Sequence, residues 1–141
     1  MVARYRARIS GPLLDRIDLH VSVPPVPFRD LAGEPAGEGS EAVRARVVCA
    51  REVQRDRLRG ESGVHANGQM GPAQIRRCCR ASPQIARLLQ QALDRLALSA
   101  RAYHRILKVA RTLADLDGSD VIRPRHAAEA IQYRGLDRAS R

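Results

Sequence analysis

The sequence predicts a mainly α protein. Five segments begin at a Ser or Pro that favours a helix start, and the longer ones repeat apolar residues at helical spacing. The chain has no Trp, one Phe and three Tyr, so its core must consist of Leu, Ile, Val and Ala. Such side chains suit helix-on-helix packing. Its 141 residues allow one domain, or one small domain and part of another.

One strand-like stretch lies near the amino terminus. Ser10-Gly11-Pro12 predicts a turn, and apolar and polar residues then alternate from Ile17 to Val23, as in a strand with one buried face. Because a single strand is not stable alone, we expect residues 1–23 to end a sheet whose other strands lie upstream. Residues 24–40 are rich in Pro and Gly and predict a linker.

Residues 41–134 predict a helical domain. Its first helix would run from Ser40, as the N-cap, to about residue 59, with Gly60 ending it. The apolar stripe expected to be buried in this helix is Val43, Val47 and Ala50. A loop with the turn pair Asn67-Gly68 follows, and Pro72 then begins a short helix that reaches about Arg80.

Three further helices complete the predicted domain. Ser82-Pro83 would begin a helix over about 83–97, and Ser99 would cap another over about 100–117, which Gly118 ends. Pro124 would open the last helix, to about Tyr133. Residues 135–141 predict a frayed tail.

Composition narrows the possible environments and partners. The net charge is +10, almost entirely from Arg, which favours phosphate-bearing partners or, equally, solvated basic faces. Cys49, Cys78 and Cys79 fit neither a disulfide framework nor a zinc site, so we expect a cytoplasmic protein with no metal site. No run reaches the ~20 apolar residues that a membrane span needs, so we expect no membrane association.

Four runs of residues carry a family resemblance. They are Tyr5-Arg6-Ala7-Arg8-Ile9-Ser10-Gly11-Pro12-Leu13-Leu14-Asp15-Arg16-Ile17-Asp18-Leu19; Asn67-Gly68-Gln69-Met70 with Gln74-Ile75-Arg76-Arg77; Leu98-Ser99-Ala100-Arg101-Ala102-Tyr103-His104-Arg105-Ile106-Leu107-Lys108-Val109-Ala110-Arg111-Thr112; and Ala130-Ile131-Gln132-Tyr133-Arg134. In this order the runs resemble magnesium chelatase-related AAA+ ATPases of the ComM/YifB type. The resemblance implies that 1–23 ends the ATPase core and that 41–134 is its helical lid.

The resemblance assigns a catalytic role to Arg16. In such ATPases the Arg of the Leu-Leu-Asp-Arg-Ile-Asp run is an arginine finger, which acts in trans on the nucleotide of a neighbouring subunit. A guanidinium held beside the γ-phosphate stabilises the charge that develops during phosphoryl transfer. From the residues alone, a surface ion pair between Asp15 and Arg16 is the alternative.

Two further roles concern the helix expected over 100–117. The resemblance implies that Arg101 is sensor 2, a lid residue that contacts the phosphate of ATP; the alternative is a surface Arg. An Arg in the first helical turn opposes the helix dipole, which suggests another reason for its presence. Arg105 and Lys108 share its face and could contact DNA, although such a basic stripe is more often a solvated face and lacks aromatic residues for base stacking.

The chain lacks part of the chemistry that ATP hydrolysis needs. It contains no G-x-x-x-x-G-K-[ST] phosphate loop, so the fragment should be inactive and need no cofactor itself. The resemblance implies ATP and Mg²⁺ for the full-length protein. It also implies an upstream AAA+ core and a hexameric ring that moves DNA junctions in recombination and natural transformation. A magnesium-chelatase ATPase subunit and a small basic DNA-binding module remain as alternatives.

Overall fold

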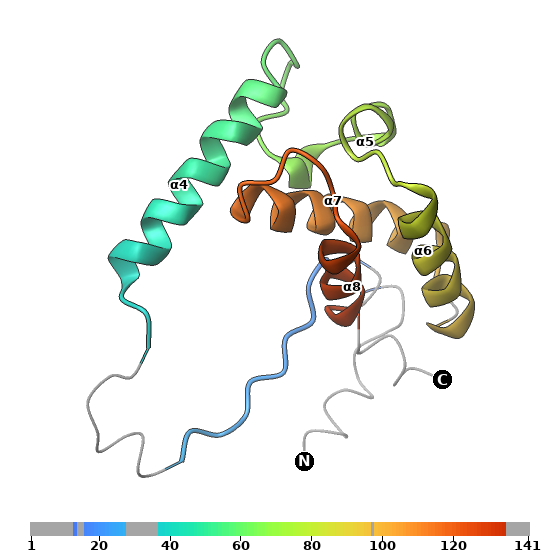
Figure 1. The fold of residues 1–141 in the computed structure, drawn as a ribbon, viewed down its shortest axis with the longest axis horizontal. Coiled ribbons are helices and arrows are strands. Elements are labelled where there is room, and N and C mark those ends of the chain that lie inside the picture. Colours follow the sequence, from blue (N-terminus) through green and yellow to red (C-terminus); the bar gives the residue numbers. More distant parts are fainter. Residues whose placement is uncertain (1–12, 14–15, 28–36, 97, 135–141) are drawn as a thin grey trace.

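The computed structural model describes residues 13, 16–27, 37–96 and 98–134. These residues form five α-helices and one 3₁₀ turn (Figure 1). In chain order the elements are α4 (Ser40–Arg57), η1 (Asn67–Gln69), α5 (Pro72–Cys78), α6 (Pro83–Leu96), α7 (Ala100–Leu116) and α8 (Pro124–Gln132). The prediction of a mainly α protein is therefore confirmed.

Helix α7 is the centre of the domain (Figure 1). Helices α5 and α8 pack against α7, α6 packs against α8, and α4 meets α7 near one end and projects away from the rest. The buried core consists of Leu58, Met70, Ile75, Cys79, Ile85, Leu89, Ile106, Leu107, Ala110, Ile122, Ala127 and Ala130. The core is thus aliphatic, as the composition predicts.

Most predicted helix ends are confirmed. The side chain of Ser99 accepts a hydrogen bond from the N–H of Ala102 at 3.2 Å, and Ser82 accepts one from Ile85 at 3.3 Å. Gly118 follows α7 with φ of 63°, a left-handed conformation that Gly adopts without steric cost. One cap prediction is wrong, because Gly39 is the N-cap of α4 and Ser40 is its first helical residue.

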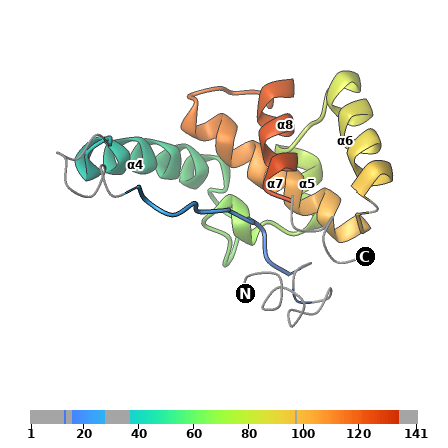
Figure 2. The same ribbon diagram turned by 90° about the horizontal axis from the view of Figure 1, so that it is seen from below.

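Helix α4 buries only the carboxyl-terminal part of the face predicted. Val43 and Val47 are 40% and 46% exposed, so the predicted apolar stripe is only partly correct. Ala50, which belongs to the predicted stripe, is buried, and so is Gln54 one turn later, close to the end at which α4 meets α7. The valines lack a packing partner among the described residues, since α4 extends beyond the bundle there (Figures 1 and 2).

Residues 16–27 do not form the predicted strand. The segment has no regular secondary structure, and its first residues lie against α7 and the end of α8. Figure 2 shows it running alongside the helices. Its burial reverses the expected alternation, because Ile17, Leu19 and Val21 are exposed whereas His20 is buried. A strand needs a partner strand to hydrogen-bond with, and no such partner exists within the described residues.

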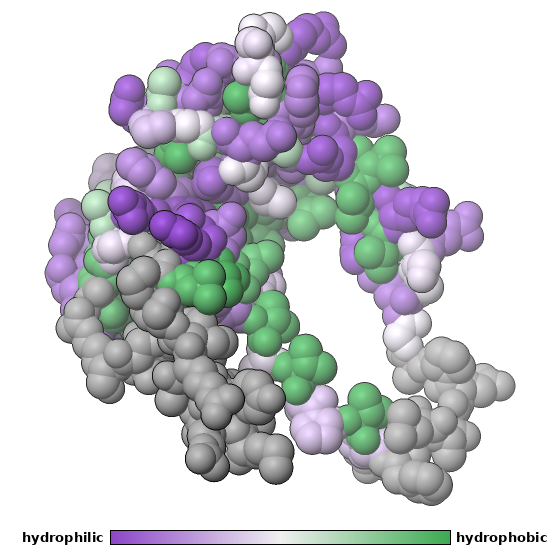
Figure 3. All heavy atoms as spheres, turned by 180° about the vertical axis from the view of Figure 1, so that it is seen from behind, coloured by the Kyte–Doolittle hydropathy of each residue, from purple (hydrophilic) through white to green (hydrophobic). Residues whose placement is uncertain are grey.

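Hydrophobic side chains remain visible on this part of the surface. Figure 3 shows them along the segment 16–27 and on α4, in contrast to the largely hydrophilic surface elsewhere on this face. In the described part of the chain no helix is both long and apolar enough to cross a membrane. The predicted tail, 135–141, lies outside the described residues.

Candidate functional site

The segment that contains Arg16 lies against helix α7. The Arg105 guanidinium, through Nη1, donates to the backbone carbonyl of Arg16 at 2.5 Å and to Oδ1 of Asp18 at 2.6 Å. The side chain of Arg105 is only 22% exposed, whereas Arg16 itself is exposed. The backbone at position 16 is therefore held, although the residue itself is exposed.

The end of α8 holds the same segment from a second direction. Nη1 of Arg134 donates to the carbonyl of Ile17 at 2.5 Å, and the N–H of His20 donates to the carbonyl of Tyr133 at 2.8 Å. Arg134 is 1% exposed and is among the largest fully buried side chains of the described residues. Its burial was not foreseen from the sequence, although Tyr133-Arg134 closes the last family-like run.

Arg101 lies in the first turn of α7 and is exposed. It precedes Arg105 by four residues, so the two side chains share a helix face. Across 16–27, 37–96 and 98–134 the structure shows no ion pair of Arg101. Its guanidinium and the N–H groups at the start of α7 can both favour an anion there.

Arg105 and Lys108 are engaged within the chain. Arg105 contacts the amino-terminal segment, and Nζ of Lys108 donates to the carbonyl of Gly68 at 2.8 Å. The predicted DNA-binding pair thus connects α7 to two different segments. Whether either residue also contacts DNA stays a prediction.

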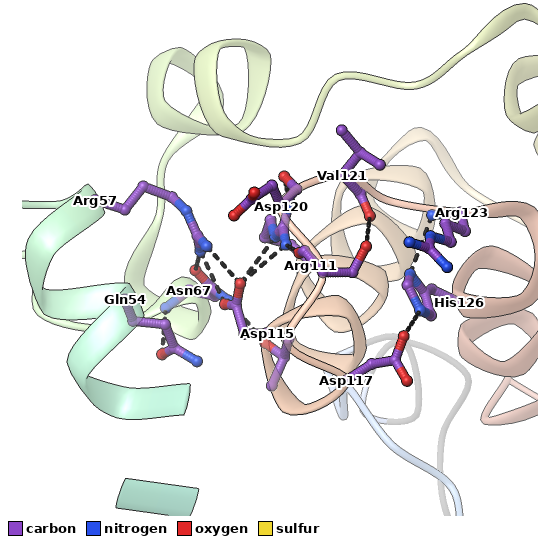
Figure 4. Close-up of polar contacts among 12 residues, drawn as sticks. Gln54, Arg57, Asn67, Arg111, Asp115, Asp117, Asp120, Val121, Arg123 and His126 are labelled. Atoms are coloured by element: carbon purple, nitrogen blue, oxygen red, sulfur yellow. Dashed lines mark hydrogen bonds and ion pairs between the residues drawn. The ribbon is translucent and has the colours of Figure 1, made fainter. Parts of the chain in front are cut away.

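A buried polar network joins α4 and η1 to α7 (Figure 4). Its centre is the carboxylate of Asp115, whose side chain is 0% exposed. It accepts two hydrogen bonds from Arg57, one from Nδ2 of Asn67 at 2.7 Å and one from Nε of Arg111 at 3.1 Å. A carboxylate can accept about four such bonds, so the hydrogen-bonding capacity of Asp115 is filled.

Further bonds extend the network to the backbone. Oε1 of Gln54 accepts from the N–H of Asn67 at 3.3 Å, while Arg111 donates to the carbonyls of Ser119 and Asp120 at 2.5 and 2.8 Å. Hydrogen bonding to Asp115 raises the pKa of Arg57 above its ordinary value, despite the opposing effect of burial. These contacts fix the loop that presents Gly68 to Lys108.

The sequence carried only weak signals for this network. Asn67 belongs to a family-like run, and Arg111 and Asp115 have the i, i+4 spacing of a helical ion pair. The involvement of Arg57, 58 residues before Asp115, depends on how α4 meets α7. The sequence pattern therefore does not predict the contact between Arg57 and Asp115.

A second polar cluster stabilises the start of α8 (Figure 4). Nδ1 of His126 accepts from the N–H of Arg123 at 3.0 Å, and its Nε2 lies 3.2 Å from Oδ2 of Asp117. Arg125 also contacts Asp117. Hydrogen bonds from Arg125 and His126 lower the pKa of the Asp117 carboxyl.

The arrangement presents exposed arginines that could pair with an anion. The exposed guanidiniums of Arg16 and Arg101 fit the negative charge of nucleotide phosphate. Among the described residues no group of three or more His, Cys, Asp or Glu side chains could hold a metal ion. The chemistry these residues offer is charge stabilisation by arginine.

Family comparison identifies the two parts of the chain. Residues 37–134 match the family described as magnesium chelatase, subunit ChlI C-terminal, and residues 1–31 match the family described as magnesium chelatase, subunit ChlI. The chain belongs to the magnesium chelatase-related family, in its ComM/YifB type. The chelatase-family C-terminal match covers every described helix.

Three known proteins are similar in sequence to nearly the whole chain. Competence protein ComM of Haemophilus influenzae is 44% identical over 97% of this chain, and the uncharacterized protein YifB of Escherichia coli is 42% identical over 96%. An uncharacterized Mycobacterium tuberculosis protein is 39% identical over 93%. The chain spans only 26% of the length of each of these chelatase-related proteins.

Proposed function

We propose that this chain provides the arginine finger and nucleotide-sensing lid of a hexameric AAA+ ATPase that moves DNA junctions during recombination and natural transformation. The printed name of the Haemophilus influenzae relative, a competence protein, supports the biological setting. The catalytic ATP and Mg²⁺ site would lie mainly in an upstream core, since this sequence contains no phosphate loop.

One observation carries the proposal: Arg16 is an exposed residue whose backbone carbonyl Arg105 holds. An arginine finger must place its charge beside the transferred phosphoryl group with little reorganisation. A surface ion pair would not need a fixed backbone. The held carbonyl therefore favours the finger over the structural alternative.

Arg101 is the proposed nucleotide-sensing residue. It lies at the positive end of the α7 dipole, where a cation is unfavourable by about 0.3–1 kcal/mol unless an anion is nearby. A phosphate of ATP would supply that anion. Because α7 also carries much of the buried core, a contact at Arg101 would act on a rigid element.

The remaining partners are an upstream core, neighbouring copies of the chain and DNA. Exposed apolar residues on the segment 16–27 agree with a covering domain; they are Ile17, Leu19, Val21, Val23 and Val26. The net charge of +10 agrees with a phosphate-bearing polymer such as DNA. Arg105 and Lys108 remain candidate contacts for it.

The test uses the full-length ATPase. Arg16→Ala should leave ATP binding nearly unchanged and reduce turnover by about 10³-fold or more, as for fingers in GTPase systems. Arg101→Ala should also impair hydrolysis, whereas Arg87→Ala, an exposed Arg on α6, should not. Normal turnover by the Arg16→Ala ring would eliminate the finger role.

A chelatase function is the second candidate, because the matching families are named for magnesium chelatase. An ATPase subunit that drives metal insertion would use the same finger and lid. Stimulation of the ATPase by DNA, with no response to a porphyrin-loaded partner, supports the DNA motor. The opposite pattern supports the chelatase.

A further inference from the structure

Residues 16–20 are fastened to the lid by hydrogen bonds from two elements. Arg105 of α7 holds the carbonyl of Arg16 and the carboxylate of Asp18, and Arg134 after α8 holds the carbonyl of Ile17. The N–H of His20 bonds to the carbonyl of Tyr133. Four hydrogen bonds thus engage nearly every residue of a five-residue stretch.

Apolar packing does not explain this attachment. Ile17 is 40% exposed, Leu19 is 49% exposed and Val21 is 64% exposed. A cavity of about 350 Å³, lined in part by Leu19, Val109 and Leu113, remains between the segment and α7. The hydrogen bonds therefore set the position of the segment.

The contact between Arg134 and the segment is unusual because it is made by an almost fully buried charged side chain. A guanidinium stays charged in proteins, and burying it is costly unless acceptors surround it. Arg134 is nevertheless 1% exposed and lies two residues after the end of α8. Its N–H bonds to the carbonyl of Ile131 at 3.0 Å, which fixes its own backbone on the last turn of the helix.

We propose that Arg105 and Arg134 are positioning residues that fasten the Arg16 segment to α7 and α8, so that movement of the lid moves the finger. The proposal rests on the proposed function for its catalytic consequence, because it assumes that Arg16 acts on ATP. The fastening itself concerns only contacts within this chain.

The proposed sensor residue and one of the two fastening residues lie close together on α7. Arg101, the proposed sensor, lies four residues before Arg105 on the same face of α7. Helices α7 and α8 pack together, and both contribute small residues to the core that are buried to 1% exposure or less, namely Ala110, Ala127 and Ala130. Small side chains allow close approach, and such packed elements move as units. Arg105 lies on this pair of helices, and Arg134 lies just beyond its end and is tied to its last turn by the bond to Ile131.

The first experiment measures the fastening in the 141-residue chain by amide hydrogen exchange. Arg105→Ala and Arg134→Ala should each increase the exchange rate at His20 by about tenfold or more, because the segment is released. Lys108→Ala is the matched control, since Lys108 lies on α7 but contacts Gly68. Unchanged exchange at His20 in a folded Arg105→Ala chain would overturn the proposal.

A charge exchange separates positioning from general destabilisation. Asp18→Arg alone should release the segment, and Asp18→Arg with Arg105→Asp should restore much of the protection, because the pair is reformed with opposite orientation. Arg105 is not fully buried, so this pair remains informative if Arg134→Ala fails to fold. Absence of any rescue, with the double variant folded, counts against the ion pair as a fastener.

The second experiment measures catalysis in the full-length ring. Arg105→Ala should lower kcat by about 10- to 100-fold with little change in KM for ATP, as expected for a misplaced catalytic group. In an Arg16→Ala background, Arg105→Ala should cause no further loss. Additive losses would overturn the proposal, whereas a lack of effect of Arg16→Ala alone would remove the finger assignment and leave the exchange result standing.

Discussion

The bundle α5–α8 and the segment 16–27 are attached to the molecule by different forces. Ile85, Leu89 and Ile106 in the bundle are no more than 1% exposed, whereas Leu19 in the segment is 49% exposed. The bundle is stabilised mainly by burial of apolar surface, which is non-directional. The segment is held by a few directional hydrogen bonds. Apolar burial in the bundle α5–α8 therefore provides most of the stability of the domain, whereas hydrogen bonds fix the position of the segment 16–27.

Helix α4 shows that the distinction is not one of secondary structure. It is a regular helix of 18 residues, yet much of its valine surface is exposed and its end is joined to α7 through Asp115. A polar junction of this kind specifies one relative orientation, since each partner must meet its acceptor. We expect the largest single-residue effect at this junction.

Replacing Asp115 should therefore be the most damaging change. Asp115→Ala leaves Arg57 and Arg111 without their buried carboxylate, and should reduce the free energy of unfolding by about 3–5 kcal/mol. Urea denaturation measures the loss. Asp56→Ala is the matched control because the Asp56–Arg59 pair is exposed, and should change stability by no more than about 1 kcal/mol. Equal effects of the two changes would contradict a central role for Asp115.

Truncating apolar residues in the two regions tests the comparison directly. Ile106→Ala, in the bundle, should reduce the free energy of unfolding by about 2–5 kcal/mol because it leaves a cavity. Val21→Ala, in the segment, should change it by no more than about 0.5 kcal/mol. Thermal and urea unfolding of both variants provides the comparison. A large loss from Val21→Ala would mean that apolar packing holds the segment after all.

Two serines test the helix caps at a smaller scale. Ser99→Ala removes the acceptor of the Ala102 N–H and should cost about 1 kcal/mol. Ser40→Ala should cost almost nothing, because Ser40 is helical and Ala is the best helix former. Chemical denaturation can resolve this difference. A Ser40→Ala loss as large as that of Ser99→Ala would restore Ser40 as a cap.

The smallest expected effect concerns pH. The pKa of Asp117 is lowered in the folded chain by Arg125 and His126, so its contribution to stability is present above the unfolded value of about 3.8 and is lost as pH falls through the folded pKa. Unfolding temperatures measured from pH 6 downward should show a small acid-dependent loss. Asp117→Asn should reduce that loss, and an identical pH profile in both proteins would exclude the contribution.

The helices could be predicted because their signals are local. Ser82, Ser99, Pro124 and Gly118 each act within one turn of their own position, and the structure confirms the helix boundaries they mark. Ser40 failed because the preceding Gly39 can adopt the extended cap conformation equally well. Sequence pattern could not choose between two adjacent cap candidates.

The site could be predicted only in part because its contacts join distant residues. Arg16 and Arg101 were recognised by family-like runs, but nothing in their neighbourhoods indicated that Arg105 bonds to residue 16 or that Arg134 bonds to residue 17. The valines of α4 and the apolar residues of the segment were assigned to a core because periodicity reports amphipathicity. It does not report whether a partner surface is present.

Mixed rings provide the most direct test of the central claim, that Arg16 acts on a neighbouring subunit's ATP. Full-length Arg16→Ala subunits retain an ATP site but lack the finger, whereas subunits unable to bind ATP retain Arg16. Each population alone should be nearly inactive, and the mixture should recover ATP turnover because an intact Arg16 faces an intact ATP site at some interfaces. A mixture that stays inactive, although it assembles, would contradict the account.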